Sequence, residues 1–376
     1  MKRVVAVLLA VSMLLLCGCG AEQVQTGPGN GWEPVRSMEL SYATQFAVDY
    51  YDGGYKLITL ADGSRFLVIP EGGTAPKGMA QDIQPLYQPL ENIYLAASAV
   101  MCLFDALDAL DSIRLSGTKA DGWYIDNARA AMEEGKILFA GKYNEPDYEL
   151  LLSSGCSLAV ESMMIGHASD VGDKLKELGI PVFVDQSSTE QHPLGRTEWI
   201  RLYGALLNEE EKADALFRQQ TDYLDALADS EPTGKTVAFF YISTSGRVVA
   251  RKSTDYVSRM IELAGGDYVF SDLGDPELLT STIALEMETF FAAAKDADYI
   301  IYNSTIGGEV KNLSELIAKS ELLQEFRAVQ NGNVWCTGQN MYQETTGLGQ
   351  MIQSFHDVFS GAADELDEVP YLYRLH

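Results

Sequence analysis

The side chains with the greatest capacity for binding chemistry fall into two groups. Met163, Met164 and His167 lie close together in the chain. Thioether and imidazole groups can ligate haem iron or contact a flat macrocycle. The alternative is structural, because adjacent methionines commonly fill gaps in a core and a lone histidine is commonly a hydrogen-bonded polar group. The sequence leaves both interpretations open.

Arg196, Arg247 and Arg251 form the second group. A guanidinium binds a carboxylate or a catecholate through parallel hydrogen bonds, and it keeps its charge when buried. Because the chain carries 54 acidic residues against 27 basic ones, each arginine could instead form an ordinary surface ion pair. Trp199 and the tyrosines supply rigid apolar surface under either interpretation.

Sequence signatures of common enzymes are missing. The chain contains no Gly-x-Ser-x-Gly, His-Glu-x-x-His, Gly-x-Gly-x-x-Gly, Walker or Cys-x-x-Cys motif, so no nucleophile with its base and no phosphate loop is indicated. A bare transition-metal site would require the fold to bring His167 and His192 together. We therefore expect no catalytic residues, no resident metal and no cofactor.

The first residues predict export. Lys2 and Arg3 precede an apolar run over 4–16 that is too short to span a bilayer as a mature helix. The tetrad Leu16-Cys17-Gly18-Cys19 resembles the bacterial lipobox, which implies a signal peptide over 1–18 and a lipidated Cys19. The Gly-, Gln- and Pro-rich residues that follow predict a solvated tether within 19–41. We expect a protein anchored by lipid to the outer face of the cytoplasmic membrane.

Composition narrows the function further. The chain has 376 residues and a formal net charge of -27, and such an acidic body is repelled by nucleic acid and by anionic lipid. About 340 mature residues exceed one compact core and favour two lobes. Cys102, Cys156 and Cys336 are too scattered for a disulfide framework. We expect a monomer.

Hydrophobic patterning predicts an α/β fold. The region 42–91 is expected to contain a β-hairpin or meander over 42–70 and then a loop. Short apolar runs alternate with helical segments over 92–207 and again over 232–376, which is typical of doubly wound lobes with mostly parallel sheets. The region 208–231 is expected to link the lobes as one long rigid helix, with Asn208 as its N-cap.

Ligands of open α/β sheets bind at the carboxyl ends of the strands, so a cleft between the lobes should receive the side chains that follow them. In the first lobe the rule selects Glu161, Met163, Met164 and His167 after one strand, and Ser187 and Arg196 after another. In the second lobe it selects Tyr241, Arg247, Asn303, Ser304 and Tyr342.

Three segments resemble a known family, the periplasmic-binding proteins of iron-siderophore, haem and cobalamin ABC importers. These are Glu149–Ser162 (ELLLSSGCSLAVES), Glu262–Leu273 (ELAGGDYVFSDL) and Glu288–Tyr302 (ETFFAAAKDADYIIY). The resemblance extends from about Tyr42 to Phe359. It implies two lobes around a ligand cleft, and it leaves the 42–70 hairpin either covering a lobe edge or contributing to the ligand mouth.

The resemblance also implies partners. An ABC permease and its ATPase would receive the ligand, and Glu149 and Glu288 would meet arginines of the permease; the alternative is that each acid stabilises a helix dipole. The implied ligand is a ferric siderophore first, then haem, then cobalamin. A lipoprotein enzyme on an α/β scaffold, a bare metal-ion binder and a surface adhesin are the competing interpretations.

Overall fold

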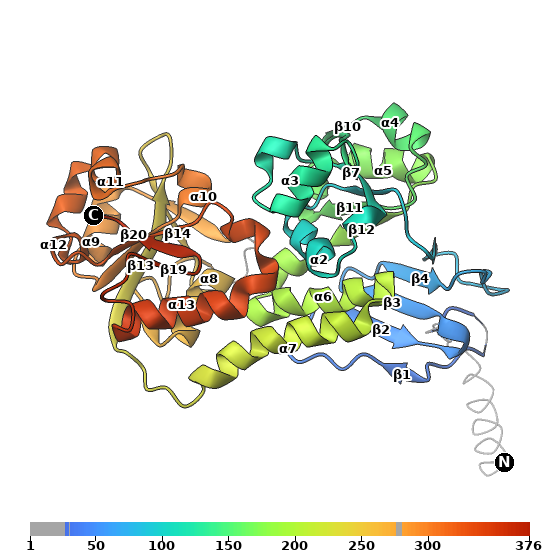
Figure 1. Ribbon diagram of the computed structural model, residues 1–376, viewed down its shortest axis with the longest axis horizontal. Helices are drawn as coiled ribbons and strands as arrows, with labels where there is room; N and C mark the ends of the chain where they lie inside the picture. Colours follow the sequence, from blue (N-terminus) through green and yellow to red (C-terminus); the bar gives the residue numbers. More distant parts are fainter. Residues whose placement is uncertain (1–26, 30, 276–279) are drawn as a thin grey trace, which may run out of the picture.

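Two α/β lobes lie side by side in the computed structural model, which describes residues 27–29, 31–275 and 280–376 (Figure 1). The predicted two-lobed α/β architecture is therefore confirmed. The expected signal peptide, Cys19 and most of the expected tether lie outside the described residues.

The first lobe contains a five-stranded parallel sheet. Its strands, in spatial order, are β12 (Val182–Asp185), β11 (Ala159–Ser162), β6 (Ile93–Leu95), β7 (Ile113–Ser116) and β8 (Leu138–Phe139). Helices cover both faces, namely α2 (Met101–Ala106), α3 (Asp126–Glu133), α4 (Tyr148–Ser153) and α5 (Ser169–Glu177). Because both faces are covered, the strands are mostly apolar. The strand order reverses between β6 and β11, which places a binding crevice outside their carboxyl ends.

The second lobe contains a mixed sheet whose central strands β13 (Lys235–Ile242), β17 (Tyr299–Tyr302) and β18 (Val334–Thr337) are parallel. Its outer strands are β14 (Val248–Arg251), β15 (Gly266–Tyr268), β16 (Thr282–Leu285), β19 (Glu368–Val369) and β20 (Leu372–Arg374). Its helices are α8 (Tyr256–Leu263), α9 (Met287–Ala294), α10 (Ser304–Gly307), α11 (Leu313–Lys319), α12 (Arg327–Gln330) and α13 (Leu348–Ser360). The lobe does not end with α13, because β20 returns to pair with β18.

Two consecutive helices join the lobes, α6 (Pro193–Leu207) and α7 (Glu210–Leu227). Phe217 of α7 lies in the core of the first lobe and Leu227 in that of the second. The expected N-cap role of Asn208 is wrong. Asn208 ends α6 in the left-handed conformation, with φ 62°, which asparagine tolerates better than most residues.

The N-terminal region forms a separate five-stranded sheet in sequential order. Its strands are β1 (Arg36–Ser37), β2 (Phe46–Tyr50), β3 (Lys56–Leu60), β4 (Arg65–Ile69) and β5 (Ile83–Tyr87). The expected meander is present, but two expectations are wrong. The predicted loop contains β5, and the predicted tether joins the body from Trp32 onward, since the Trp32 ring packs edge-on against Tyr55.

The N-terminal sheet packs on α6. The Phe46 and Trp199 ring centroids lie 5.1 Å apart, and the buried Lys56 forms a 2.5 Å ion pair with Glu210 of α7. Of the two roles open from the sequence, the structure favours covering the lobe.

The remaining sequence expectations concern the thiols and the membrane. Cys102, Cys156 and Cys336 are all free thiols. Over the described residues, the helices are too short or too polar to span a bilayer.

Candidate functional site

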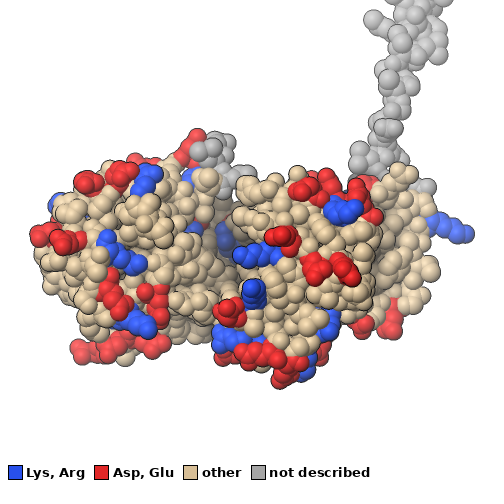
Figure 2. All heavy atoms as spheres, turned by 90° about the horizontal axis from the view of Figure 1, so that it is seen from above, with Lys and Arg blue, Asp and Glu red and all other residues tan. Residues whose placement is uncertain are grey.

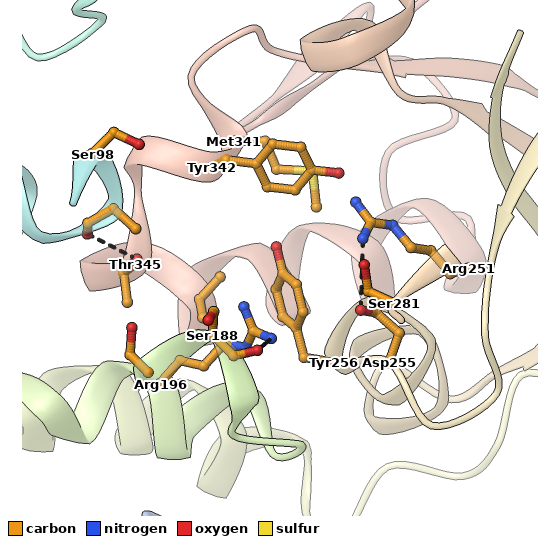
Figure 3. A pocket seen from close by; sticks show the side chains of 13 residues that line it. Ser98, Ser188, Arg196, Arg251, Asp255, Tyr256, Ser281, Met341, Tyr342 and Thr345 are labelled. Carbon is orange, nitrogen blue, oxygen red and sulfur yellow. Dashed lines mark hydrogen bonds and ion pairs between the residues drawn. The ribbon is translucent and has the colours of Figure 1, made fainter. Parts of the chain in front are cut away.

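A cavity of about 270 Å³ lies between the two lobes (Figure 3). Figure 2 shows the hollow that separates them, with basic side chains in and beside it on a surface otherwise rich in acids. The first-lobe side is lined by Ser98, Ala99, Ser187, Ser188 and Arg196, and the other side by Arg251, Asp255, Tyr256, Ser281, Met341, Tyr342, Thr345 and Leu348. Among the described lining residues, none comes from the N-terminal sheet.

Arg196 enters the cavity from the first turn of α6. Its Nε donates to the carbonyl of Glu190 over 3.1 Å, and its Nη2 donates to the carbonyl of Ser188. The guanidinium lies 3.7 Å from the ring centroid of Tyr256, which belongs to the other lobe. Burial lowers the pKa of Arg196, and the charge of Arg251 acts in the same direction, yet a guanidinium stays protonated at neutral pH.

Arg251 enters from the end of β14 and is 6% exposed. It lies 5.2 Å from the ring centroid of Tyr342 and 3.6 Å from the Asp255 carboxylate. Asp255 also accepts a 3.0 Å hydrogen bond from the Val257 amide, capping α8. Among the described residues, Nη2 of Arg251 has no hydrogen-bond partner. Two guanidiniums and one carboxylate line the cavity, so it is suited to an anion.

Three other predicted residues belong to this site or support it. Ser187 lines the cavity, and its hydroxyl donates to the buried Asp185 carboxylate. Asn303 lies behind the wall, where its Nδ2 donates to the Tyr342 hydroxyl over 2.6 Å. Tyr342 therefore presents its ring to Arg251 from a fixed position.

Four predicted residues lie elsewhere. Ser304 is buried and donates to the Thr337 carbonyl. Tyr241 packs against the core of the second lobe. Arg247 forms a 3.0 Å ion pair with Glu286, so the surface interpretation holds for this arginine. His167 is exposed and is not among the described residues that line either this cavity or the next.

A second cavity of about 430 Å³ adjoins the first at Ser98. It is lined by Ala96, Ser98, Gly117, Thr118, Lys119, Asp121, Gly122, Phe139, Lys142, Tyr143, Ser162 and Met164. Met164 lines this cavity beside aromatic and basic side chains, and both Met163 and Met164 are exposed. The sulfur and imidazole groups predicted to act together are not brought together. Within the described ranges, no group of three or more His, Cys, Asp or Glu residues could hold a metal ion.

Direct hydrogen bonds close the mouth of the cleft. The Tyr124 hydroxyl donates to Gln339 over 2.6 Å, and Gln343 donates to the Gly122 carbonyl over 2.8 Å. These bonds cross from one lobe to the other. The first cavity is smaller than typical ligand pockets of about 300–1,000 Å³, so a bulky ligand requires the mouth to open.

One strand-end acid does not face the cleft. Glu161 shares its side of β11 with the buried Ala159 and is 0% exposed. Neither carboxyl oxygen has a hydrogen-bond partner among the described residues. Burial raises the pKa of Glu161 to about 8. The side chain is therefore an internal neutral acid rather than a ligand contact.

Glu149 and Glu288 occupy matching positions in the two lobes. Each lies exposed in the first turn of its helix, α4 in the first lobe and α9 in the second. Their docking role stays a prediction.

Sequence reasoning passed over Asp255 and Tyr256, which line the cavity. They begin α8 directly after β14. Because β14 runs antiparallel to β13, the rule that points to the carboxyl ends of parallel strands does not select them. The sequence signal that could have selected Asp255 is its position four residues after Arg251, with which it forms an ion pair.

Known proteins resemble this chain in sequence and fold. Residues 99–341 match the family model described as periplasmic binding protein. An uncharacterized lipoprotein of Methanocaldococcus jannaschii is 27% identical over 330 residues, covering 81% of this chain and 77% of that protein.

Solved structures share the fold, and two of them serve as examples. The periplasmic haem-binding protein of Vibrio cholerae aligns with a TM-score of 0.57 and 19% identity, covering 70% of this chain and 98% of that one. The periplasmic vitamin B12-binding protein of Vibrio cholerae aligns with a TM-score of 0.51 and 18% identity, covering 72% and 98%. Identities this low establish the fold alone.

Proposed function

Because the chain belongs to the periplasmic binding protein family, we propose that it is a lipid-anchored solute-binding protein of an ABC importer. It captures a bulky, partly anionic metal complex outside the cell and delivers this complex to the permease, which works with its ATPase. A ferric siderophore is the first candidate, followed by haem and cobalamin.

One observation carries the proposal. Arg196 and Arg251 come from opposite lobes and line one cavity, and Nη2 of Arg251 is buried without a partner among the described residues. A buried unpaired donor costs about 1–3 kcal/mol, and more when it is charged. A carboxylate or catecholate oxygen would remove that cost and would pair with both guanidiniums.

The aromatic walls support a bulky ligand. Tyr256 and Tyr342 each lie beneath one guanidinium, and Phe139 and Tyr143 line the adjoining cavity. Aromatic rings supply apolar contact area with little conformational freedom to lose. A siderophore with anionic iron ligands and an apolar or aromatic body matches both cavities. Haem ranks second, because Met163 and His167 do not line them.

The test is a binding screen of the purified mature protein by fluorescence quenching. A ferric tris-catecholate, haem, cobalamin and free Zn²⁺ and Mn²⁺ serve as probes. We expect binding of at least one complex. Arg196→Gln or Arg251→Gln should weaken it by about tenfold to a hundredfold, since a charged hydrogen bond contributes about 1.5–3 kcal/mol. Arg247→Gln is the matched control, as it removes an arginine that lies outside the cavity. Binding of a free ion alone would overturn the proposal.

A further inference from the structure

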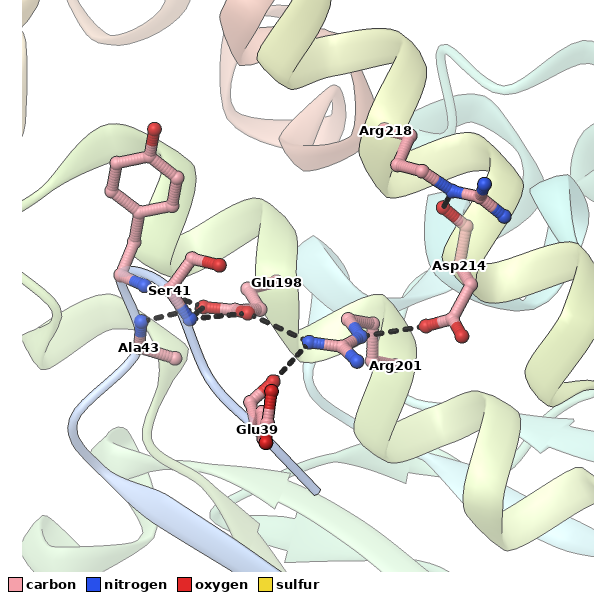
Figure 4. A network of polar contacts seen from close by, with 8 residues as sticks. Glu39, Ser41, Ala43, Glu198, Arg201, Asp214 and Arg218 are labelled. Atoms are coloured by element: carbon pink, nitrogen blue, oxygen red, sulfur yellow. Dashed lines mark hydrogen bonds and ion pairs between the residues drawn. The ribbon is translucent and has the colours of Figure 1, made fainter.

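The segment 39–45, here called the strap, leads from β1 to β2 along α6. Its backbone amides point at Glu198, whose carboxylate accepts from Ser41 over 2.8 Å, Tyr42 over 2.7 Å and Ala43 over 2.8 Å (Figure 4). Arg201 donates to the same carboxylate over 3.0 Å. The first half of the strap is therefore attached to the middle of α6.

The second half of the strap is attached to Glu190, which precedes α6 and is 2% exposed. The Glu190 carboxylate accepts from the Thr44 amide over 2.9 Å and from the Gln45 amide over 3.0 Å. It also accepts from the Thr44 hydroxyl over 3.0 Å and from the Trp199 indole over 3.1 Å. Four donors thus satisfy this buried acid, which a buried carboxylate requires.

Glu190 connects the strap to the ligand cavity through its backbone. Its carboxylate bonds the strap, whereas its carbonyl accepts from Nε of Arg196. The carbonyl of Ser188, in the same loop, accepts from Nη2 of Arg196. The position of loop 187–190 therefore fixes the guanidinium plane.

We propose that Glu190 is a positioning residue of the ligand site, and that the strap completes this site from outside the cavity. By binding the Glu190 carboxylate, the strap holds the loop that orients Arg196. The inference rests on the proposed function for its ligand. It assigns a ligand-site role to residues 44–45, which precede the family-matched stretch 99–341.

The test compares Glu190→Gln with Glu198→Gln in the full chain. Each variant removes one buried carboxylate charge that accepts hydrogen bonds from strap amides, so both loosen the strap. The hydrogen bonds that fix the Arg196 guanidinium go to the carbonyls of Glu190 and Ser188, and Glu198 takes no part in them. The probes are an anionic ferric tris-catecholate and a neutral ferric tris-hydroxamate. Glu190→Gln should weaken binding of the anionic complex about tenfold, which corresponds to about 1.4 kcal/mol, and should change binding of the neutral one much less. Glu198→Gln should leave the ratio of the two affinities unchanged.

The sign of the effect separates positioning from simple electrostatics. Removing a negative charge near Arg196 should strengthen binding of an anion if Glu190 acts through its charge alone. Tighter binding of the anionic complex by Glu190→Gln, or equal losses in both variants, would overturn the proposal.

Hydrogen exchange without any ligand keeps this result distinct from a failure of the proposed function. Amides of 187–196 should exchange faster in Glu190→Gln than in Glu198→Gln at matched stability. Equal exchange in that loop would also overturn the positioning role. A wild-type protein that binds neither complex would count against the proposed function, whatever the exchange result.

Discussion

Glu161→Gln is the perturbation with the clearest energetic consequence. Burial raises the pKa of Glu161 to about 8, from an ordinary value of 4.5. Both carboxyl oxygens lack hydrogen-bond partners among the described residues, so no hydrogen bond from these residues stabilises the charged form. Glutamine has nearly the shape of the protonated acid and does not titrate, so it mimics the form that the fold prefers.

The direction of the pH dependence follows from the two pKa values. Between about 4.5 and 8, the unfolded chain releases the proton of Glu161 while the folded chain keeps it. The contribution of this group to stability is therefore complete below the unfolded pKa and is lost as the pH rises through the folded one. Since one pH unit corresponds to about 1.36 kcal/mol, the loss is roughly 4–5 kcal/mol. That is a large part of the roughly 5–15 kcal/mol that stabilises a folded domain.

Urea unfolding at pH 5, 7 and 9 measures the effect. Wild type and Glu161→Gln should have similar free energies of unfolding at pH 5, and the variant should be more stable by several kcal/mol at pH 9. Glu133→Gln, at an exposed position of α3, is the control and should track wild type. A difference between wild type and Glu161→Gln that is the same at pH 5 and pH 9 would refute the reasoning.

Three further predictions concern anchoring, docking and motion. Mass analysis of the mature protein should find a lipid on Cys19, and Cys19→Ala should release the protein from the membrane; an unlipidated N-terminus elsewhere would contradict this. Glu149→Ala with Glu288→Ala should abolish uptake and leave ligand affinity intact, because exposed rim charges act on association with a partner. The control is Glu133→Ala with Glu321→Ala, which also removes two exposed acids. Equal uptake by the two double variants would count against docking. Small-angle scattering should find a small change in radius on binding, because a continuous α7 resists bending; a change as large as that of a strand-hinged binding protein would exclude it.

The fold was largely predictable because its central strands are buried and form recognisable apolar runs between helices. The expected strands around Val160, Phe183 and Ile300 are present with helices between them. The pattern failed where an element is short or atypical. β5 carries Pro85, which argues against a strand unless it lies at an edge, as this one does. β19 and β20 have two and three residues, too few for a period to be visible.

The site was less predictable, because its composition depends on how the lobes pack. The strand-end rule reached Ser187, Arg196 and Tyr342, which line the cavity. It also selected Arg247, which local sequence does not distinguish from Arg251. In the structure Arg247 follows the turn after β13 and meets Glu286, whereas Arg251 ends β14 inside the cleft. Contacts such as Arg196 on Tyr256 join residues from opposite lobes, and no local pattern encodes them.

The placement of the two arginines also implies that closure of the cleft depends on the charge of the ligand. Arg196 and Arg251 come from opposite lobes and line one cavity, so their like charges oppose closure of the cleft when no anion is present. An anion between them reverses the sign of that interaction. The hydrogen bonds from Tyr124 to Gln339 and Gln343 are exposed, and each such bond contributes only about 0.5–1.5 kcal/mol. These exposed bonds therefore add little resistance to opening, and an anionic ligand that pairs with both guanidiniums supplies an attraction that favours closure.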